Sequence, residues 1–171
     1  MIRDAETNPD AAGEGGNASL EAVRDGAETG FSTPVTVVGD ERVSLTHDVV
    51  RTLPAAERTV TTACASGVRH TSTWAGVPVD ALLSLADAPG ETTHVLVEST
   101  DGYRRCLDVA TALDGLLAFV RDGTPIADRA SFETRSVAPG TDGAETVKAV
   151  ATLEARHLDA GTDPESFERR G

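Results

Sequence analysis

The chain has 171 residues, enough for one domain with a hydrophobic core and too few for two domains of ordinary size. Its formal net charge is −13, so electrostatic repulsion excludes a nucleic acid or an anionic membrane as the expected partner. Two cysteines are too few for a disulfide framework, and no segment has the roughly 18 apolar residues that cross a bilayer. Without a secretory signal pattern, we expect a cytoplasmic protein with no direct membrane insertion and no nucleic-acid partner.

The basic residues are fourteen arginines and a single lysine, Lys148. An acidic surface that is poor in lysine stays hydrated in concentrated salt, where screening removes the repulsion between its carboxylates. We therefore predict a salt-loving, halophilic source. A mesophilic acidic protein is the alternative interpretation.

Residues 1–30 are acidic and rich in glycine, alanine and asparagine, and they have too little apolar surface to offset the entropy of ordering. We predict a disordered acidic tail there, with one helical turn at 19–23. A folded domain is expected over residues 31–157. Residues 158–171 are predicted to form a flexible C-terminal tail.

Within the folded domain, short β-branched runs alternate with short helical segments. Thr46 and Asp108 are placed to cap helices, and a loop is expected between Cys64 and Trp74. The predicted strands are 34–38, 58–64, 94–99, 103–107, 116–121, 124–126, 135–137 and 147–153, and the predicted helices are 47–53, 79–86 and 109–113. Many short strands interrupted by short helices predict an α+β domain with mixed β-sheets.

Cys64 ends one of these strands, and ten residues later a Trp-x-Gly-x-Pro sequence begins at Trp74. Five other landmarks come in order: a short helix region at 43–54, a Ser-x-Asp-Gly-Tyr turn at 99–103, a Leu-Ala hairpin at 117–126, an Arg-x-x-x-Pro-Gly loop at 135–140 and a Gly-x-x-x-x-Lys segment at 143–148. In this order and spacing, the chain resembles the sulfite oxidase family of molybdopterin-binding oxidoreductases, as an acidic member of haloarchaeal type. The resemblance implies a sulfite-oxidase-type molybdopterin-binding fold with mixed β-sheets and short helices.

The resemblance also implies a site. Cys64 would be the ligand of a molybdenum atom carried by molybdopterin, because a thiolate is a soft donor. Arg135, Thr146 and Lys148 would bind the pterin cofactor, and Tyr103 would be a catalytic residue that hydrogen-bonds a substrate oxygen. The alternatives are a small core residue for Cys64, surface positions for Arg135 and Lys148, and packing against the sheet for Tyr103.

These expectations lead to a molybdopterin-dependent oxidoreductase that transfers an oxygen atom or two electrons on a small oxyanion or sulfoxide. Its partners would be a small anionic substrate and an electron-transfer or completing protein, because the chain has no haem-attachment motif and no iron–sulfur cysteine cluster. The alternative is a cofactor-free binding or assembly module that keeps the fold. Glu133, Asp142 and Glu145 favour that alternative, because carboxylates near a phosphate-bearing cofactor would repel it.

The four histidines are scattered, and no two of them have metal-binding spacing, so we expect no zinc site. Arg69 and His70 follow Cys64 closely and are predicted to lie in a solvated loop. A position at the mouth of the cofactor pocket is the alternative for this pair, because an anionic substrate would be attracted to a cation there.

Overall fold

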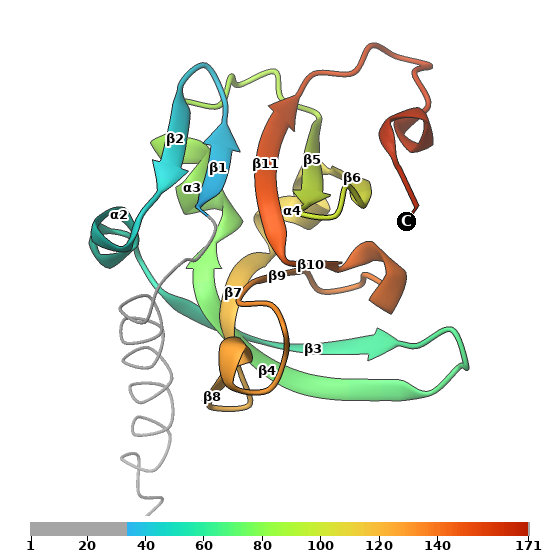
Figure 1. Ribbon diagram of the computed structural model, residues 1–171. Coiled ribbons are helices and arrows are strands. Elements are labelled where there is room, and N and C mark those ends of the chain that lie inside the picture. Colours follow the sequence, from blue (N-terminus) through green and yellow to red (C-terminus); the bar gives the residue numbers. More distant parts are fainter. Residues whose placement is uncertain (1–33, 171) are drawn as a thin grey trace, which may run out of the picture.

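The computed structural model describes residues 34–170, so the predicted disordered tail at 1–30 and its helical turn lie outside the described residues. The described chain folds into two β-sheets that share a hydrophobic core, with short helices beside the strands (Figure 1). This arrangement confirms the α+β class with mixed sheets.

The first sheet has five strands in the order β2-β1-β11-β5-β6. β1 and β11 run parallel, and Val37 pairs with Leu153, whereas the other neighbours are antiparallel. Val35 and Val37 of β1 are buried, and the residues between and after them are half-buried, as expected for a strand with one face on the core. The strands are β1 (Val35–Val38), β2 (Arg42–Leu45), β5 (His94–Ser99), β6 (Arg104–Asp108) and β11 (Val150–Arg156).

The second sheet is antiparallel and has the order β10-β9-β7-β4-β3, with β8 paired to β7. Its strands are β3 (Ala56–Ala63), β4 (Arg69–Pro78), β7 (Leu116–Arg121), β8 (Thr124–Pro125), β9 (Arg135–Val137) and β10 (Val147–Lys148). β10 and β11 replace the single strand predicted at 147–153. Ala149 separates them, because its φ of 50° is outside the extended region.

In the described part of the chain, three helices lie beside the sheets: α2 (His47–Thr52), α3 (Val79–Leu85) and α4 (Val109–Leu113). Three 3₁₀ turns come later in the sequence: η2 (Ile126–Asp128), η3 (Gly143–Glu145) and η4 (Pro164–Phe167). The predicted caps are present: Thr46 Oγ1 accepts the N–H of Val49, and Asp108 Oδ1 accepts the N–H of Thr111. Among the described residues, none of the helices has the length and hydropathy needed to cross a bilayer.

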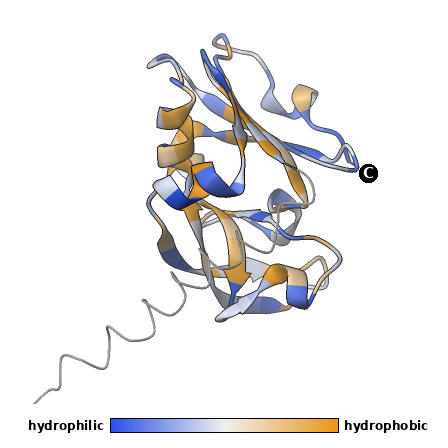
Figure 2. Ribbon diagram, turned by 60° about the vertical axis from the view of Figure 1, so that its left-hand side comes forward, coloured by the Kyte–Doolittle hydropathy of each residue, from blue (hydrophilic) through white to orange (hydrophobic). Residues whose placement is uncertain are grey.

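The core lies between the two sheets and under α3 and α4. In Figure 2, hydrophobic residues gather along the strands and helices in the middle of the molecule, and hydrophilic residues lie on the outer loops. The core side chains with no measurable or almost no exposure include Val35, Leu45, Leu82, Val95, Leu117 and Leu153. Removing such apolar surface from water supplies most of the stabilisation of a domain of this kind.

β4 is the largest difference from the predicted elements. The loop predicted between Cys64 and Trp74 is wrong for residues 69–74, which form the first part of this strand. Thr71 and Thr73 lie opposite Thr61 and Thr59 of β3, and each pair is joined by a side-chain hydrogen bond. The threonine pairing joins residues of two separate runs, so a pattern read along one run does not reveal it.

Gly76 lets the centre of the second sheet form. A Cβ atom at this position would lie 2.0 Å from the carbonyl oxygen of Leu117 and 2.7 Å from the Cα of Ala118, both on β7. The register between β4 and β7 shifts at the same point, between Ala75 and Gly76. A residue type that usually weakens strands is therefore required here, because only its missing side chain allows the backbones to approach.

The C-terminal segment at 158–170, predicted to be a flexible tail, contacts the edge strand β6. Arg169 forms a β-bridge with this strand. Glu168 Oε2 lies 2.8 Å from Nη1 of Arg105, and Oε1 accepts the N–H of Cys106 at 3.2 Å. Burial raises the pKa of the Cys106 thiol, and the Glu168 carboxylate raises it further. The segment thus supplies partners to an edge that would otherwise present unpaired backbone groups.

We expect the Glu168→Gln variant to lose about 2 kcal/mol of unfolding free energy, because the buried Arg105 guanidinium loses its counter-charge. Urea unfolding at neutral pH measures the effect. The matched control is Glu165→Gln, whose side chain is exposed on η4 and has no ion pair among the described residues. Equal stability of the two variants would show that the ion pair between Glu168 and Arg105 adds nothing to the stability of the fold.

Candidate functional site

Cys64 directly follows β3 and begins the turn that leads into β4. Its N–H donates to the carbonyl oxygen of Val68 at 2.8 Å, and its own carbonyl oxygen accepts the N–H of Gly67 at 2.8 Å. The thiol is exposed, whereas the other cysteine, Cys106, is buried. The alternative of a core position therefore does not hold for Cys64, and its proposed role as a metal ligand stays open to test.

The η3 turn packs against the end of β3, at Ala63, the residue before Cys64. A Cβ atom at Gly143 would lie 2.9 Å from the carbonyl oxygen of Ala63, so the turn needs a glycine at its closest point. The turn is closed by a capping box, in which Asp142 and Glu145 accept each other's backbone N–H groups. This contact holds η3 against Ala63, the residue that precedes the cysteine.

Arg135 and Thr146 form the central contact of the candidate site. Nε and Nη2 of Arg135 donate to Oγ1 of Thr146 at 3.0 and 2.6 Å, and that hydroxyl donates to the carbonyl oxygen of Gly143 at 2.8 Å. Burial lowers the pKa of Arg135, and the charge of Arg121 lowers it further, while the Cys64 thiol acts in the opposite direction. Arg135 therefore lies within electrostatic reach of Cys64 and keeps its charge, since the guanidinium remains protonated in proteins.

Lys148 lies opposite Arg135 in the pairing of β10 with β9. Its side chain is exposed, and Nζ lies 5.8 Å from the centre of the Phe132 ring. Directly opposed residues in an antiparallel pair project from the same face of the sheet. The structure thus brings Arg135, Thr146 and Lys148 together, and Cys64, from a distant segment of the sequence, lies within electrostatic reach of Arg135.

Tyr103 belongs to the other sheet, at the turn between β5 and β6. Its N–H donates to Oδ1 of Asp101 at 3.0 Å, and its carbonyl oxygen accepts the N–H of Ser99 at 2.8 Å. The Tyr103 backbone hydrogen bond lowers the pKa of Asp101. The side chain is half-buried and packs against the main core, and its catalytic role remains a prediction.

A cavity of about 310 Å³ adjoins Arg135 and was not foreseen from the sequence. Two more arginines, Arg121 and Arg129, line it together with Trp74. The centre of the Trp74 ring lies 5.1 Å from the guanidinium carbon of Arg121 and 5.2 Å from that of Arg135. Trp74 is 3% exposed, and its indole N–H has no acceptor in the described part of the chain. The arginines come from β7, β9 and a loop, so no local motif could have revealed the cluster.

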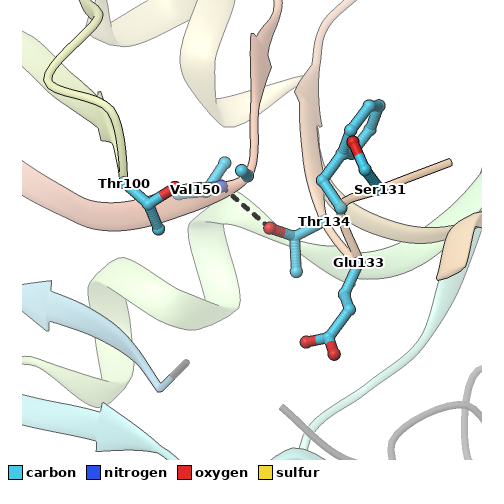
Figure 3. A pocket seen from close by; sticks show the side chains of 7 residues that line it. Thr100, Ser131, Glu133, Thr134 and Val150 are labelled. Carbon is cyan, nitrogen blue, oxygen red and sulfur yellow. Dashed lines mark hydrogen bonds between the residues drawn. The ribbon is translucent and has the colours of Figure 1, made fainter. Parts of the chain in front are cut away.

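A second cavity, of about 140 Å³, lies on the first-sheet side of the segment at 131–134 (Figure 3). Thr100, Ser131, Glu133 and Thr134 line it, and Oγ1 of Thr134 accepts the N–H of Val150 at 2.9 Å. Phe132 lines both cavities, which makes this segment the wall between them. Residues 34–170 contain no group of three or more histidine, cysteine or acidic side chains arranged to hold a metal ion.

The family model described as "Oxidoreductase molybdopterin binding domain" matches residues 23–162. The chain belongs to this family. The matched region of this molybdopterin-binding-domain protein includes Cys64, Arg135, Thr146 and Lys148 and both sheets, and it ends shortly after β11. No curated protein matches the chain.

Among solved structures, the molybdopterin-binding-domain chain is similar to the sulfane dehydrogenase SoxCD from Paracoccus pantotrophus. The TM-score is 0.66 and the sequence identity is 20%, over 76% of this chain and 39% of that chain. This likeness supports the fold alone. Together with the family match it confirms the sulfite-oxidase-type molybdopterin-binding fold that the sequence resemblance predicts.

The residues at the site fit a group that carries both a soft metal and a phosphate. The exposed thiol of Cys64 suits the metal, and the cations of Arg135 and Lys148 suit the phosphate. Of the carboxylates that would oppose such a group, Glu145 is committed to the N–H of Asp142 within the η3 capping box. This hydrogen bond fixes the position of the Glu145 carboxylate within the turn and leaves its charge in place.

Proposed function

We propose that this chain binds molybdopterin and acts as a molybdopterin-dependent oxidoreductase, transferring an oxygen atom or two electrons on a small oxyanion or sulfoxide. The observation that carries the proposal is the exposed Cys64 thiol beside the Arg135–Thr146 contact, where η3 meets the end of β3. The family to which the chain belongs supports molybdopterin as the class of cofactor.

Each residue has a defined task in this proposal. Cys64 holds the metal through its sulfur, because a thiolate is a soft ligand. Arg135 and Lys148 bind the phosphate of the cofactor, the first through a planar fork and the second as a point charge. Thr146 orients the fork by accepting two of its N–H groups. When bound, the cofactor supplies the redox chemistry, and the protein supplies position and charge.

The same cations favour a small anionic substrate, because a positive site on a strongly acidic chain attracts anions locally. Tyr103 is proposed to contact a substrate oxygen. Electrons must pass to or from a partner protein, since neither a haem-attachment motif nor an iron–sulfur cysteine cluster occurs in the sequence.

The test measures molybdenum and pterin in the chain purified from a molybdenum-replete host, in dilute and in concentrated salt. Arg135→Gln is expected to lower pterin content by about tenfold or more, because a charge-assisted phosphate contact is lost. The control is Arg42→Gln, an exposed arginine on β2 in the other sheet. Wild-type protein that is folded and carries neither metal nor pterin would favour a cofactor-free binding or assembly module.

A further inference from the structure

β3 is an edge strand of the second sheet and differs from the other sheet edges (Figure 1). β10 has two residues and β2 has four, while β6 is covered by the C-terminal segment through Arg169. β3 has eight residues, contains no proline and pairs with β4 without a bulge. A long and regular edge strand of this kind is a template for pairing with another strand.

The backbone groups of Thr59 and Thr61 point away from β4. In an antiparallel pair, residues that bond to the partner strand alternate with residues whose N–H and C=O groups face the other way. Thr73 lies opposite Thr59 but exchanges hydrogen bonds with Asp122: its N–H donates to Oδ1 at 2.8 Å, and its carbonyl oxygen accepts the N–H at 2.7 Å. Thr59 therefore does not bond to β4, and Thr61, two residues on, faces the open edge in the same way.

The carbonyl oxygens at the two ends of this edge already have contacts. Nη1 of Arg58 donates to the carbonyl oxygen of Glu57 at 3.0 Å, and η3 packs against the carbonyl oxygen of Ala63. No residue in the described part of the chain hydrogen-bonds to the outward backbone groups of Thr59 or Thr61. These two residues are therefore the fully open part of the strand.

We propose that β3 pairs with β3 of a second copy of this chain, antiparallel and around a two-fold axis at Val60. In this register Thr59 lies opposite Thr61 of the second copy, and Thr61 lies opposite its Thr59. This is the register in which both open residues of one copy meet those of the other. The Thr59–Thr73 and Thr61–Thr71 side-chain pairs, joined at 3.2 and 2.8 Å, then form one row of hydroxyls across both copies.

The charges at the edge permit this pairing. Arg58 comes opposite Thr62 of the second copy and Glu57 opposite its Ala63, so no like charges are directly opposed. Over longer distances the two copies repel, because each carries a net charge of −13. Salt screens this repulsion, whereas the backbone hydrogen bonds join uncharged groups. The pairing should therefore tighten as salt is raised, while a contact held by ion pairs would weaken.

Sedimentation equilibrium of the full chain, from about 1 μM to about 1 mM, tests the proposal. Because the contact is short, we expect a monomer–dimer equilibrium with a dissociation constant of micromolar order or weaker, lower in concentrated than in dilute salt. Thr61→Pro removes an outward N–H and should raise that constant by about tenfold or more. Thr61→Glu should also raise it, because two carboxylates then lie diagonally across the axis. The matched control is Thr162→Glu, which adds the same charge at an exposed threonine of the C-terminal segment and should not change the constant.

Disulfide formation between two variants locates the contact. Chains with Thr59→Cys are mixed with chains with Thr61→Cys and oxidised with diamide, both in a Cys64→Ser background that removes the exposed native thiol. Directly opposed residues in a hydrogen-bonded antiparallel pair have Cα atoms about 5.5 Å apart, a distance that suits a disulfide. We expect a cross-linked dimer in the mixture.

The inference is overturned by a monomer at every concentration in concentrated salt, or by an association that weakens as salt is raised. A dimer that both Thr61 variants leave unchanged, or one that gives no disulfide in the mixture, overturns it as well. Thermal unfolding establishes that each variant is folded. The pairing uses none of the groups proposed to hold molybdopterin and is measured on metal-free protein. Its failure therefore leaves the proposed function standing, and absence of molybdenum from the purified chain leaves the pairing standing.

Discussion

Replacing Cys64 by serine is expected to remove molybdenum from the purified protein. An alcohol is a harder and far less acidic group than a thiol, so it does not substitute for a thiolate as a ligand of a soft metal. Replacing a residue that contacts a metal ligand already lowers metal affinity by about 10- to 100-fold. Loss of the ligand itself should therefore lower metal affinity by more than about 100-fold. Metal analysis of wild-type and variant protein, made in the same molybdenum-replete host, gives the result directly.

The chain contains its own control for this experiment. Cys106→Ala also removes a thiol, but Cys106 is buried beside the C-terminal segment in the first sheet and has no proposed metal role. It should lower stability modestly and leave the metal content unchanged. Because Cys64 is exposed, Cys64→Ser should unfold at the same temperature as metal-free wild-type protein. Retention of molybdenum in Cys64→Ser, or its loss in both variants, would contradict the assignment of Cys64 as the ligand.

Among the glycines at 34–170, Gly76 is the position where replacement by alanine is expected to have the largest effect on folding. The new Cβ would lie 2.0 Å from the Leu117 carbonyl oxygen, and the atoms it meets are backbone atoms in the middle of a sheet. Neither strand can move away without breaking its pairing with the next strand. We expect a loss of more than about 4 kcal/mol, or protein that does not fold.

Gly90→Ala is the matched control for Gly76→Ala. Nothing lies within 4 Å of a Cβ atom at Gly90, and its backbone does not adopt a positive φ. The change should therefore alter the unfolding free energy by no more than about 0.5 kcal/mol. Urea unfolding compares both variants with the wild type. If Gly76→Ala is as stable as Gly90→Ala, the close approach of β4 and β7 is not a constraint on the sequence.

Local patterns in the sequence were sufficient to predict most of the helices and strands. The helix caps at Thr46 and Asp108 and the β-branched runs depend on neighbouring residues, and these predictions are confirmed. β4 was missed, because Gly76 and the serine at 72 interrupt the apolar pattern. The reason for Gly76 lies on β7, some forty positions away in the chain, where no local pattern reaches.

The candidate site shows the same difference between features that sequence motifs mark and features that depend on the fold. Cys64, Arg135 and Lys148 were found because the family motifs mark them, and the structure then shows Arg135 facing Lys148 and held by Thr146. Arg121 and Arg129 carry no motif. Arg121 lies beside Arg135 through long-range contacts, namely its hydrogen bond to Ser72 and the Trp74 ring that both guanidinium groups contact, whereas Arg129 is held locally by Thr124. The family motifs therefore led to the proposed roles of Cys64, Arg135 and Lys148, which stay predictions, and they gave no sign of the cavity that adjoins Arg135.

The parallel pairing of β1 with β11 has a consequence for how the chain reaches its native state. β11 is the middle strand of the first sheet, and it follows in the chain both of the strands with which it pairs, β1 and β5. β1 and β2 can form a hairpin early, but β1 meets its second neighbour only when Leu153 has left the ribosome. Contacts of such long sequence separation slow folding. The first sheet is thus completed only once β11 has been made, and until then β1 and β5 each expose an edge to which other chains can bind.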